Sequence, residues 1–249
     1  MQDFIDPEIQ SLFAKHQLDS FAALWALDLE AVDRPNIERG GWSSVSYLEL
    51  DGQGFYLKRQ INHLTRSLCK PLGEPTFARE FRTIEQYRKL AIPALTAAWF
   101  GQRKVGREHQ AILVTHALTG WQDLDSWMKQ WPELDATVQR GILQACGRLA
   151  RTLHQAGQMH GCFYPKHIFL QHGNAGFEAQ LIDLEKTRPL WLGRRDRIKD
   201  LEPLLRRTSH VWTAAEHKTL LLSYLQDEAR VEQWYQLLLR RRADKDSRP

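Results

Sequence analysis

The chain has 249 residues, of which 43% are hydrophobic and 26% are charged, so it is long enough to bury a core in one large domain or two smaller parts. Its formal net charge of +4 is compatible with a nucleotide, a phosphosugar or an anionic membrane surface, and does not choose among them. Three cysteines, none of them in a Cys-x-x-Cys pair, argue against a disulfide framework and favour a reducing compartment.

The first third of the chain predicts two helices followed by a hairpin. Residues 1–7 lack the basic and apolar regions of a signal peptide, and no run approaches 18 apolar residues, so we expect a cytoplasmic protein without a transmembrane span. Residues 8–33 predict two short helices with one apolar stripe. Residues 39–50 predict a turn that leads into a strand, and after the Asp-Gly-Gln-Gly turn at 51–54 the strand 55–59 returns.

A helix and two further strands complete this part of the chain. Residues 76–90 have apolar side chains at helical spacing, and Pro93 follows the helix. Strands are expected around 97–102 and 110–115. We therefore assign residues 1–118 to a first part, in which helices precede a small antiparallel sheet with one further helix.

The rest of the sequence is mainly helical. The strongest amphipathic pattern covers residues 138–156, and Gly157 stands where a C′ glycine ends a helix. Three more helices are predicted, at residues 197–205, 214–226 and 231–239. The fold class is thus α+β, with a helical second part at 119–239 and a frayed basic tail at 240–249.

The polar loop at residues 160–170 is the stretch with the most chemistry, and Asp183 follows it on a strand-like segment. A polar loop, a hairpin and an acid at a strand end are how kinase-like folds build a metal–phosphate site, although Asp183 could equally be a strand-end cap. His160, Tyr164 and His167 could bind zinc, but no further ligands stand at zinc-like spacing. Cys162 and His160 could form a nucleophile and base, but no oxyanion element is visible.

Two sites nearer the N-terminus could bind phosphate. Gly40 and Gly41 could let backbone N–H groups approach a phosphate, or could simply form a hairpin. Lys58 lies on a predicted strand, where a lone lysine is usually solvated, but a helix with Glu80 follows. This order is the one in which kinase folds form the ion pair that binds the α/β-phosphates. Glu85 lies nearly opposite Glu80 on the helical wheel, so only one of them can face the sheet, and we favour Glu80.

The remaining charged residues allow plainer readings. Asp200 could be a helix N-cap or could brace a buried loop. The arginine clusters at 194–197 and 240–242 could contact nucleic acid, but no aromatic stacking platform accompanies them. A solvated face, or contact with anionic lipid or phosphosugar, is the interpretation we favour, and no nucleic-acid partner is expected.

Five motifs in order resemble the bacterial lipopolysaccharide core kinases, and within them the InaA-type branch, which is related to the heptose and Kdo kinases. The motifs lie at residues 39–45, 55–59, 77–81, 159–169 and 181–185, and the likeness runs from about residue 20 to 225. Each motif alone is loose, whereas the five together are fairly specific. The resemblance implies a two-lobed protein-kinase-like fold, with ATP and Mg²⁺ as cofactors.

The resemblance also implies a role for each residue singled out above. Lys58 would bind the α/β-phosphates, and Glu80 would hold Lys58. His160 would brace the loop, Tyr164 and His167 would match the family's catalytic loop, and His167 would stand where other kinases keep a metal-binding asparagine. Asp183 would bind Mg²⁺, and Asp200 would resemble the aspartate that braces the loop. The implied reaction transfers the γ-phosphoryl group to a heptose-type or Kdo-type sugar hydroxyl of the inner core.

Cys162 departs from the family pattern, because it stands where the superfamily has the aspartate that orients the acceptor hydroxyl. General-base help is typically worth about 10²–10⁴-fold, and a thiol with a pKa of about 8.5 is a poor replacement. The alternative to a kinase is a pseudokinase, a nucleotide-binding or scaffold module of envelope biogenesis. The implied partner is the lipopolysaccharide core acceptor, with peripheral contact to the cytoplasmic face of the inner membrane.

Overall fold

The computed structural model describes residues 3–32, 34, 36–37, 41–67 and 70–246. The chain divides into two units, the first formed by residues 1–88 and 95–119 and the second by residues 89–94 and 120–249. Among the described residues, no helix combines the length and the low polarity that crossing a bilayer requires.

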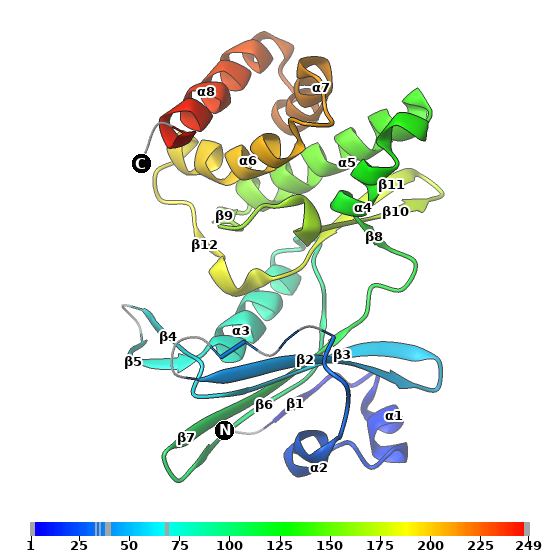
Figure 1. Ribbon diagram of the computed structural model, residues 1–249, viewed down its shortest axis with the longest axis vertical. Helices are drawn as coiled ribbons and strands as arrows, with labels where there is room; N and C mark the ends of the chain where they lie inside the picture. The colour runs from blue at the N-terminus through cyan, green and yellow to red at the C-terminus, as the bar shows by residue number, and fades with distance from the viewer. Residues whose placement is uncertain (1–2, 33, 35, 38–40, 68–69, 247–249) are drawn as a thin grey trace. The chain divides into compact units, whose positions relative to one another are not determined.

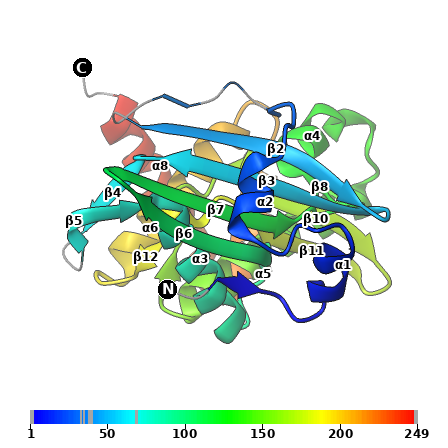
Figure 2. The ribbon, with the colours of Figure 1, turned by 90° about the horizontal axis from the view of Figure 1, so that it is seen from below.

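The first unit contains a five-stranded antiparallel sheet (Figures 1 and 2). Its strands, in spatial order, are β1 (Phe4–Ile5), β6 (Ala97–Val105), β7 (Glu108–His116), β3 (Gln53–Ile61) and β2 (Trp42–Leu50). Asp51 and Gly52 join β2 to β3 with positive φ angles of 50° and 79°, the backbone that a two-residue hairpin turn needs. A separate hairpin is formed by β4 (Leu64–Ser67) and β5 (Lys70–Pro75).

The two faces of this sheet are covered by different helices. Phe55 and Leu57 of β3 are fully buried in one apolar cluster with residues of α1 (Gln10–Lys15) and α2 (Phe21–Ala26). Burying each such side chain contributes about 2 kcal/mol. Since side chains alternate along a strand, Lys58 points to the other face, where α3 (Thr76–Lys89) lies.

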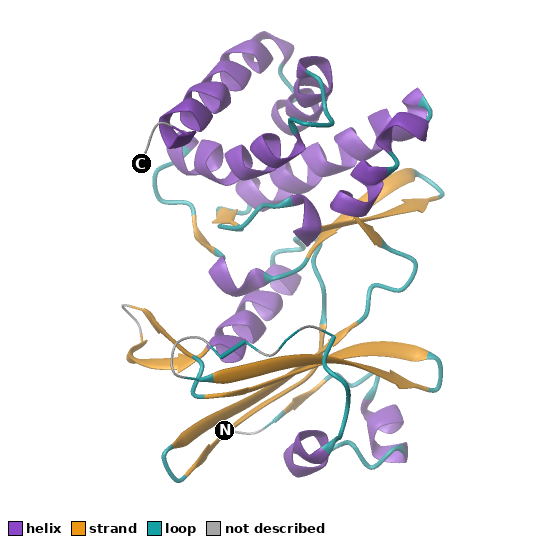
Figure 3. Cartoon of the chain, viewed as in Figure 1, coloured by secondary structure: helices purple, strands orange, loops and turns teal. Residues whose placement is uncertain are grey.

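The second unit is built around α5 (Ala136–Gln155), a twenty-residue helix that begins at the N-cap Asp135 (Figure 3). Helix α7 (Ala214–Leu225) packs directly on α5, and a Cβ atom at Gly147 would lie 2.5 Å from the Leu220 carbonyl oxygen. The close approach of the two helices therefore requires glycine at position 147. The remaining helices are α4 (Leu124–Lys129), α6 (Arg194–Thr208) and α8 (Glu228–Asp246), with a short turn of 3₁₀ helix at Trp131–Glu133.

Short strands carry the polar loop of the second unit. A three-stranded sheet has the order β11 (Gly176–Leu181), β10 (Ile168–Gly173) and β8 (Gln122–Asp123), and β9 (Gln158–Met159) pairs with β12 (Arg188–Pro189). Two 3₁₀ turns lie at Pro165–His167, within the loop, and at Leu184–Lys186, directly after Asp183. The loop thus leaves β9 and enters β10, and both of its ends are hydrogen-bonded into sheets.

Four features differ from the sequence predictions. Helix α8 continues to Asp246, so residues 240–246 are helical and not a frayed tail, because neither glycine nor proline interrupts the helix there. Helix α6 begins at Arg194, not at 197. Residues 89–94 cluster with the second unit, where the Leu181 N–H donates to the Pro93 carbonyl over 3.1 Å. The strands of two residues and the β4–β5 hairpin carry too little periodicity to be predicted.

Candidate functional site

Lys58 and Glu80 form a short ion pair inside the first unit. The Lys58 Nζ atom lies 2.6 Å from Glu80 Oε1, and the two side chains are 17% and 4% exposed. Val45 and Leu113 flank Lys58 on the neighbouring strands, and they fix its position in the sheet. Glu85, the competing carboxylate, pairs instead with Arg88 on the exposed side of α3. The choice between the two glutamates is therefore settled by which face of α3 packs on the sheet.

Gln60 fixes the start of α3 and thereby the position of Glu80. Its Oε1 atom accepts hydrogen bonds from the Phe77 N–H over 2.9 Å and from the Thr76 hydroxyl over 2.8 Å. Its Nε2 atom donates to the His63 carbonyl over 2.7 Å, and the Gln60 side chain is completely buried. An amide on β3 thus satisfies a free N–H group at the helix N-terminus, which is the task of a capping residue.

The predicted glycine pair falls partly outside the described residues. Gly40 is not among them, whereas Gly41 lies directly before β2. A Cβ atom at Gly41 would lie 2.4 Å from the His63 backbone nitrogen and 2.5 Å from the Asn62 carbonyl carbon. Glycine at position 41 therefore has a packing reason, and phosphate binding by the pair stays a prediction.

Asp200 holds the polar loop of the second unit in place through hydrogen bonds to its backbone. Its Oδ2 atom accepts the backbone N–H of His160 over 2.8 Å and the Nε2–H of His154 over 3.1 Å, and its Oδ1 atom accepts the N–H of Gly161 over 2.7 Å. Asp200 is 1% exposed and lies inside α6, so of the two predicted readings the N-cap is wrong and the brace describes its contacts. The helix was predicted to begin at residue 197, and α6 begins at Arg194, directly after Gly193, so Asp200 lies well inside it.

His160 has a fixed tautomer. Its Nε2 atom lies 2.9 Å from the Ile182 carbonyl oxygen, which can only accept, so this nitrogen carries the proton. Its Nδ1 atom accepts the Cys162 N–H over 3.3 Å. Both ring nitrogens are thereby used inside the protein, and the ring is completely buried. His160 is consequently unavailable as a zinc ligand or as a base for a cysteine nucleophile, and both alternative readings are wrong.

Cys162 is a buried thiol in this loop. Its side chain is 5% exposed, and burial raises the pKa of the thiol above its ordinary value, outweighing the opposing effect of Lys186. The protonated thiol is neither a strong nucleophile nor an effective base at neutral pH. The Cys162 carbonyl, in contrast, accepts the Tyr164 N–H over 2.7 Å and the His167 Nδ1–H over 2.9 Å. Position 162 therefore contributes to the site through its backbone.

His167 and Asp183 come together at the end of the loop. The His167 Nε2 atom lies 3.2 Å from Asp183 Oδ2. Burial lowers the pKa of His167, and the nearby Asp183 carboxylate opposes this only in part, which favours the neutral ring. Because Nδ1 carries the proton that the Cys162 carbonyl accepts, Nε2 presents a lone pair toward a carboxylate oxygen. In the neutral ring these two acceptors repel each other, and either a cation beside them or a proton on Nε2 removes the repulsion.

The backbone and exposure of Asp183 are also unusual. Its φ and ψ angles of 58° and 63° are left-handed, a conformation that costs about 1–3 kcal/mol in a non-glycine residue and clusters at functional sites. Its side chain is 44% exposed and makes no capping hydrogen bond to the following turn. The reading of Asp183 as a cap is therefore wrong. One carboxylate oxygen faces His167, and the side chain remains open to solvent.

Tyr164 is held by an arginine that the sequence analysis did not single out. The Arg207 guanidinium carbon lies 4.3 Å from the centre of the Tyr164 ring, and the centre of the His167 ring lies 5.5 Å from that of Tyr164.

His154 is a second residue that the sequence analysis did not single out, and its Nδ1 atom accepts a hydrogen bond from the Tyr224 hydroxyl over 2.8 Å. A polar residue on the buried face of the strongest helix was the signal that could have found His154.

The described residues contain no group of three or more histidine, cysteine, aspartate or glutamate side chains placed to hold a metal ion. A cation at His167 and Asp183 would therefore need ligands from a bound molecule or water. Mg²⁺ is typically held in this way, by one or two carboxylates together with substrate phosphates. The Asp183 oxygen fits that donor set well, and a neutral imidazole nitrogen is a less usual partner for Mg²⁺.

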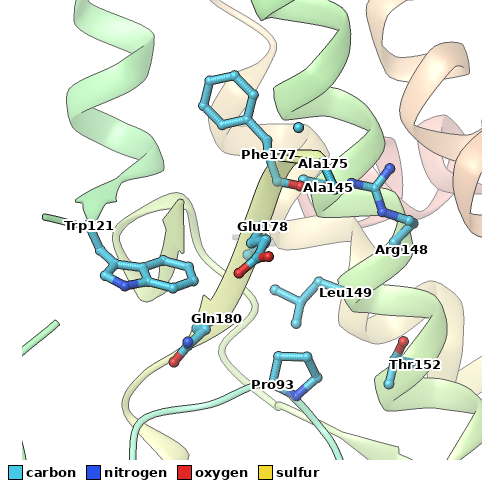
Figure 4. A pocket seen from close by; sticks show the side chains of 12 residues that line it. Pro93, Trp121, Ala145, Arg148, Leu149, Thr152, Ala175, Phe177, Glu178 and Gln180 are labelled. Carbon is cyan, nitrogen blue, oxygen red and sulfur yellow. Dashed lines mark hydrogen bonds between the residues drawn. The ribbon is translucent and has the colours of Figure 1, made fainter. Parts of the chain in front are cut away.

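The second unit also contains a groove of about 590 Å³, and its lining residues are different from the site residues described above. Figure 4 shows Trp121 and Gln180 on one side of it and Leu149 and Thr152 on the other. Arg148, at its edge, donates to a backbone carbonyl of β11 over 2.8 Å. None of the predicted site residues lines this groove.

Three comparisons with known proteins bear on the site. The chain matches the family model described as "Lipopolysaccharide kinase (Kdo/WaaP) family" over residues 22–224. It is 33% identical over 174 residues to Protein InaA of Escherichia coli (strain K12), an alignment that covers 68% of this chain and 79% of InaA. A solved structure described as "WaaP in complex with acyl carrier protein" resembles it with a TM-score of 0.70 and 22% identity over 100% of both chains. This structural likeness confirms the predicted two-lobed kinase-like α+β fold.

Proposed function

Because the chain belongs to the lipopolysaccharide kinase (Kdo/WaaP) family, as its sequence predicted, we propose that it transfers the γ-phosphoryl group of ATP to a sugar hydroxyl of the lipopolysaccharide inner core. The acceptor would be a sugar of the heptose or Kdo type. The reaction would take place at the cytoplasmic face of the inner membrane, where the chain would make peripheral contact.

The Lys58–Glu80 ion pair is the observation that carries this proposal. A lysine on a central strand, held by a glutamate on the following helix, is the arrangement with which kinases bind the α/β-phosphates. Burial of Glu80 at 4% exposure prevents its carboxylate from being shared with water, so the ammonium group is held in one place. We therefore assign the phosphate contact to Lys58 and the positioning of Lys58 to Glu80.

Asp183, with His167 beside it, is proposed to hold Mg²⁺. The fit rests on the two facing acceptors described above and on the exposed carboxylate oxygen of Asp183. When bound, Mg²⁺ supplies neutralisation of the charge on the phosphate oxygens. The role of the chain is to keep His167 in one tautomer, and the Cys162 carbonyl does so. His160 and Asp200 keep the loop backbone in place, and Tyr164 packs beside His167.

Cys162 lowers the rate that we expect. Phosphoryl transfer depends mainly on positioning and charge neutralisation, so nucleotide binding and a basal rate survive the loss of a carboxylate. A general base typically contributes about 10²–10⁴-fold, and the protonated Cys162 thiol does not provide it. We therefore propose a slow phosphotransferase, in which the acceptor hydroxyl loses its proton without help from residue 162.

The buried thiol also favours a second candidate, a pseudokinase that binds nucleotide and acts as a scaffold in envelope biogenesis. The variant Cys162→Asp separates the two candidates, because it restores the carboxylate of the superfamily pattern. A gain in transfer supports the kinase. Nucleotide binding without transfer, in both wild type and Cys162→Asp, supports the scaffold.

The deciding experiment measures transfer of labelled γ-phosphate from ATP to purified core acceptor. Wild type is compared with Asp183→Ala and with the control Asp227→Ala, because the two aspartate side chains are 44% and 42% exposed. We expect transfer with wild type and the control, and loss of transfer with Asp183→Ala. Equal transfer by all three proteins would refute the role of Asp183, and no transfer with unchanged ATP-dependent thermal stabilisation would favour the scaffold.

A further inference from the structure

Two apolar side chains stand side by side in solvent on the second unit. Trp191 is 72% exposed and Leu192 is 57% exposed, and among the described residues they are the one consecutive pair of large exposed hydrophobic side chains. The other eight tryptophans of the chain are all buried or half-buried. Exposed apolar residues are unremarkable one at a time, whereas an exposed tryptophan next to an exposed leucine indicates a contact surface.

The segment that carries this pair is held firmly, and we call residues 187–193 the tryptophan loop. Asp196, which is 2% exposed, accepts the backbone N–H of Trp191 over 2.9 Å and that of Leu192 over 3.0 Å through one oxygen. Its other oxygen lies 3.1 Å from the Arg188 guanidinium group. The Leu190 N–H donates to the carbonyl of Gly157 over 2.8 Å. The backbone is therefore satisfied from inside, and the exposure of the two side chains is built into the loop.

Cationic side chains follow the tryptophan loop directly. Arg194, Arg195 and Lys199 are exposed at the start of α6, and within the described ranges the structure pairs none of them with a carboxylate. Asp196 is the acidic residue in the first turn of this helix, and it is buried and already bonded. Exposed cations at a helix N-terminus are unfavourable with respect to the helix dipole, so helix stability does not explain the arginines. Contact with an anionic partner would explain why these arginines are exposed there.

We propose that the tryptophan loop docks the second unit on an anionic phospholipid bilayer, with Trp191 and Leu192 at the interface and Arg194 and Arg195 on the headgroup phosphates. Tryptophan is favoured at the boundary between headgroups and acyl chains, and arginine extends to the phosphates there. Basic residues near such a surface are each attracted by its negative potential. The choice of a lipid surface over an acidic protein rests on the proposed function, because the acceptor in that function is a glycolipid.

Vesicle co-sedimentation tests this docking without nucleotide or acceptor. We expect the full chain to bind vesicles of phosphatidylcholine with phosphatidylglycerol, to bind pure phosphatidylcholine weakly, and to lose binding as salt rises. The variant Arg194→Gln/Arg195→Gln should bind roughly 30-fold more weakly, which corresponds to about 1 kcal/mol for each arginine. Arg107→Gln/Arg140→Gln removes two other exposed arginines and should bind as wild type does.

The apolar pair is tested with Trp191→Ala/Leu192→Ala. Its control is Val105→Ala/Leu222→Ala, which removes side chains that are 55% and 43% exposed elsewhere. We expect the first variant to lose at least about tenfold in vesicle affinity and the control to lose nothing. Brominated lipids should also quench the wild-type fluorescence, and Trp191→Phe should abolish that quenching.

Equal binding of the apolar variant and its control, or no binding of wild type to anionic vesicles, would overturn the proposal. Binding to an acidic protein but not to vesicles would overturn it as well. The outcome is separate from catalysis, because Asp183→Ala should bind vesicles as wild type does even where it transfers no phosphate. A protein that binds vesicles but transfers no phosphate would support the docking surface and contradict the proposed reaction. A protein that transfers phosphate but does not bind vesicles would support the proposed reaction and contradict the docking surface.

Discussion

Replacement of Asp200 by alanine should destabilise the second unit by about 3 kcal/mol. The substitution leaves three donors without an acceptor: the N–H groups of His160 and Gly161 and the Nε2–H of His154. His160 and His154 are 0% and 2% exposed, so their donors cannot reach water, whereas Gly161 is exposed. Each buried, unsatisfied donor costs about 1–3 kcal/mol, and the loss of a buried charge offsets part of the sum.

Urea unfolding measures the effect, with amide hydrogen exchange at His160 and Gly161 as the local readout. The two units can unfold in separate transitions, so the exchange data identify the loop that loses protection. Asp200→Asn keeps one acceptor oxygen and should cost about half as much. Glu228→Ala, an exposed carboxylate on α8, serves as the control and should stay within about 0.5 kcal/mol of wild type. An Asp200→Ala protein that is as stable as this control would refute the brace.

Three further predictions concern Glu80 in the first unit and two residues of the second unit, Gly161 and Asp196. Glu80→Gln should weaken ATP binding about tenfold in calorimetry because Lys58 loses its charged partner, whereas Glu85→Gln should leave ATP binding unchanged. Gly161→Ala should lower the free energy of unfolding by at least about 1 kcal/mol, because φ is 78° and the new Cβ atom would lie 2.6 Å from a carbonyl oxygen. Equal stability of this variant and wild type would contradict that geometry. The pKa of Asp196 is about 2, since its arginine partner and two backbone N–H groups outweigh desolvation. Its stabilisation of about 2 kcal/mol is therefore present above pH 4 and lost as the pH falls toward 2, and Asp196→Asn should flatten that acid limb of stability.

The fold was predictable where the pattern of the sequence is local. The hairpin turn at Asp51 and Gly52 needs positive φ at both residues, and the sequence provides the residue types that accept it. Lys58 and Glu80 could be predicted as a pair because a strand lysine followed by a helix glutamate is the order found in kinase folds, and the helical wheel leaves only one glutamate facing the sheet. The start of α2 also follows a local rule, since the side chain of Ser20, directly before this helix, accepts the Ala23 N–H as an N-cap should.

The parts that could not be predicted depend on contacts far apart in the sequence. Asp200 resembles an N-cap locally, and only the packing of α6 beneath the loop shows that it binds His160, forty residues away. The start of α6 has no side-chain cap and begins with two arginines, so the usual start signals are absent. Aspartate tolerates the left-handed backbone that residue 183 adopts, but nothing in the local sequence requires that conformation there.

The position of Cys162 can be separated into a backbone role and a side-chain role. Its N–H and carbonyl fix the tautomers of His160 and His167, and any residue other than proline can supply these two groups. The side chain alone decides whether the loop offers a base. Lys186 lies beside the thiol and favours its anionic form, and Asp183 disfavours it. A carboxylate introduced at position 162 would feel the same opposing effects of Lys186 and Asp183. The surroundings of position 162 are therefore still those of a base, although the Cys162 side chain does not act as one. Because Lys186 and the fixed tautomers of His160 and His167 still surround position 162, we place the slow kinase before the pseudokinase.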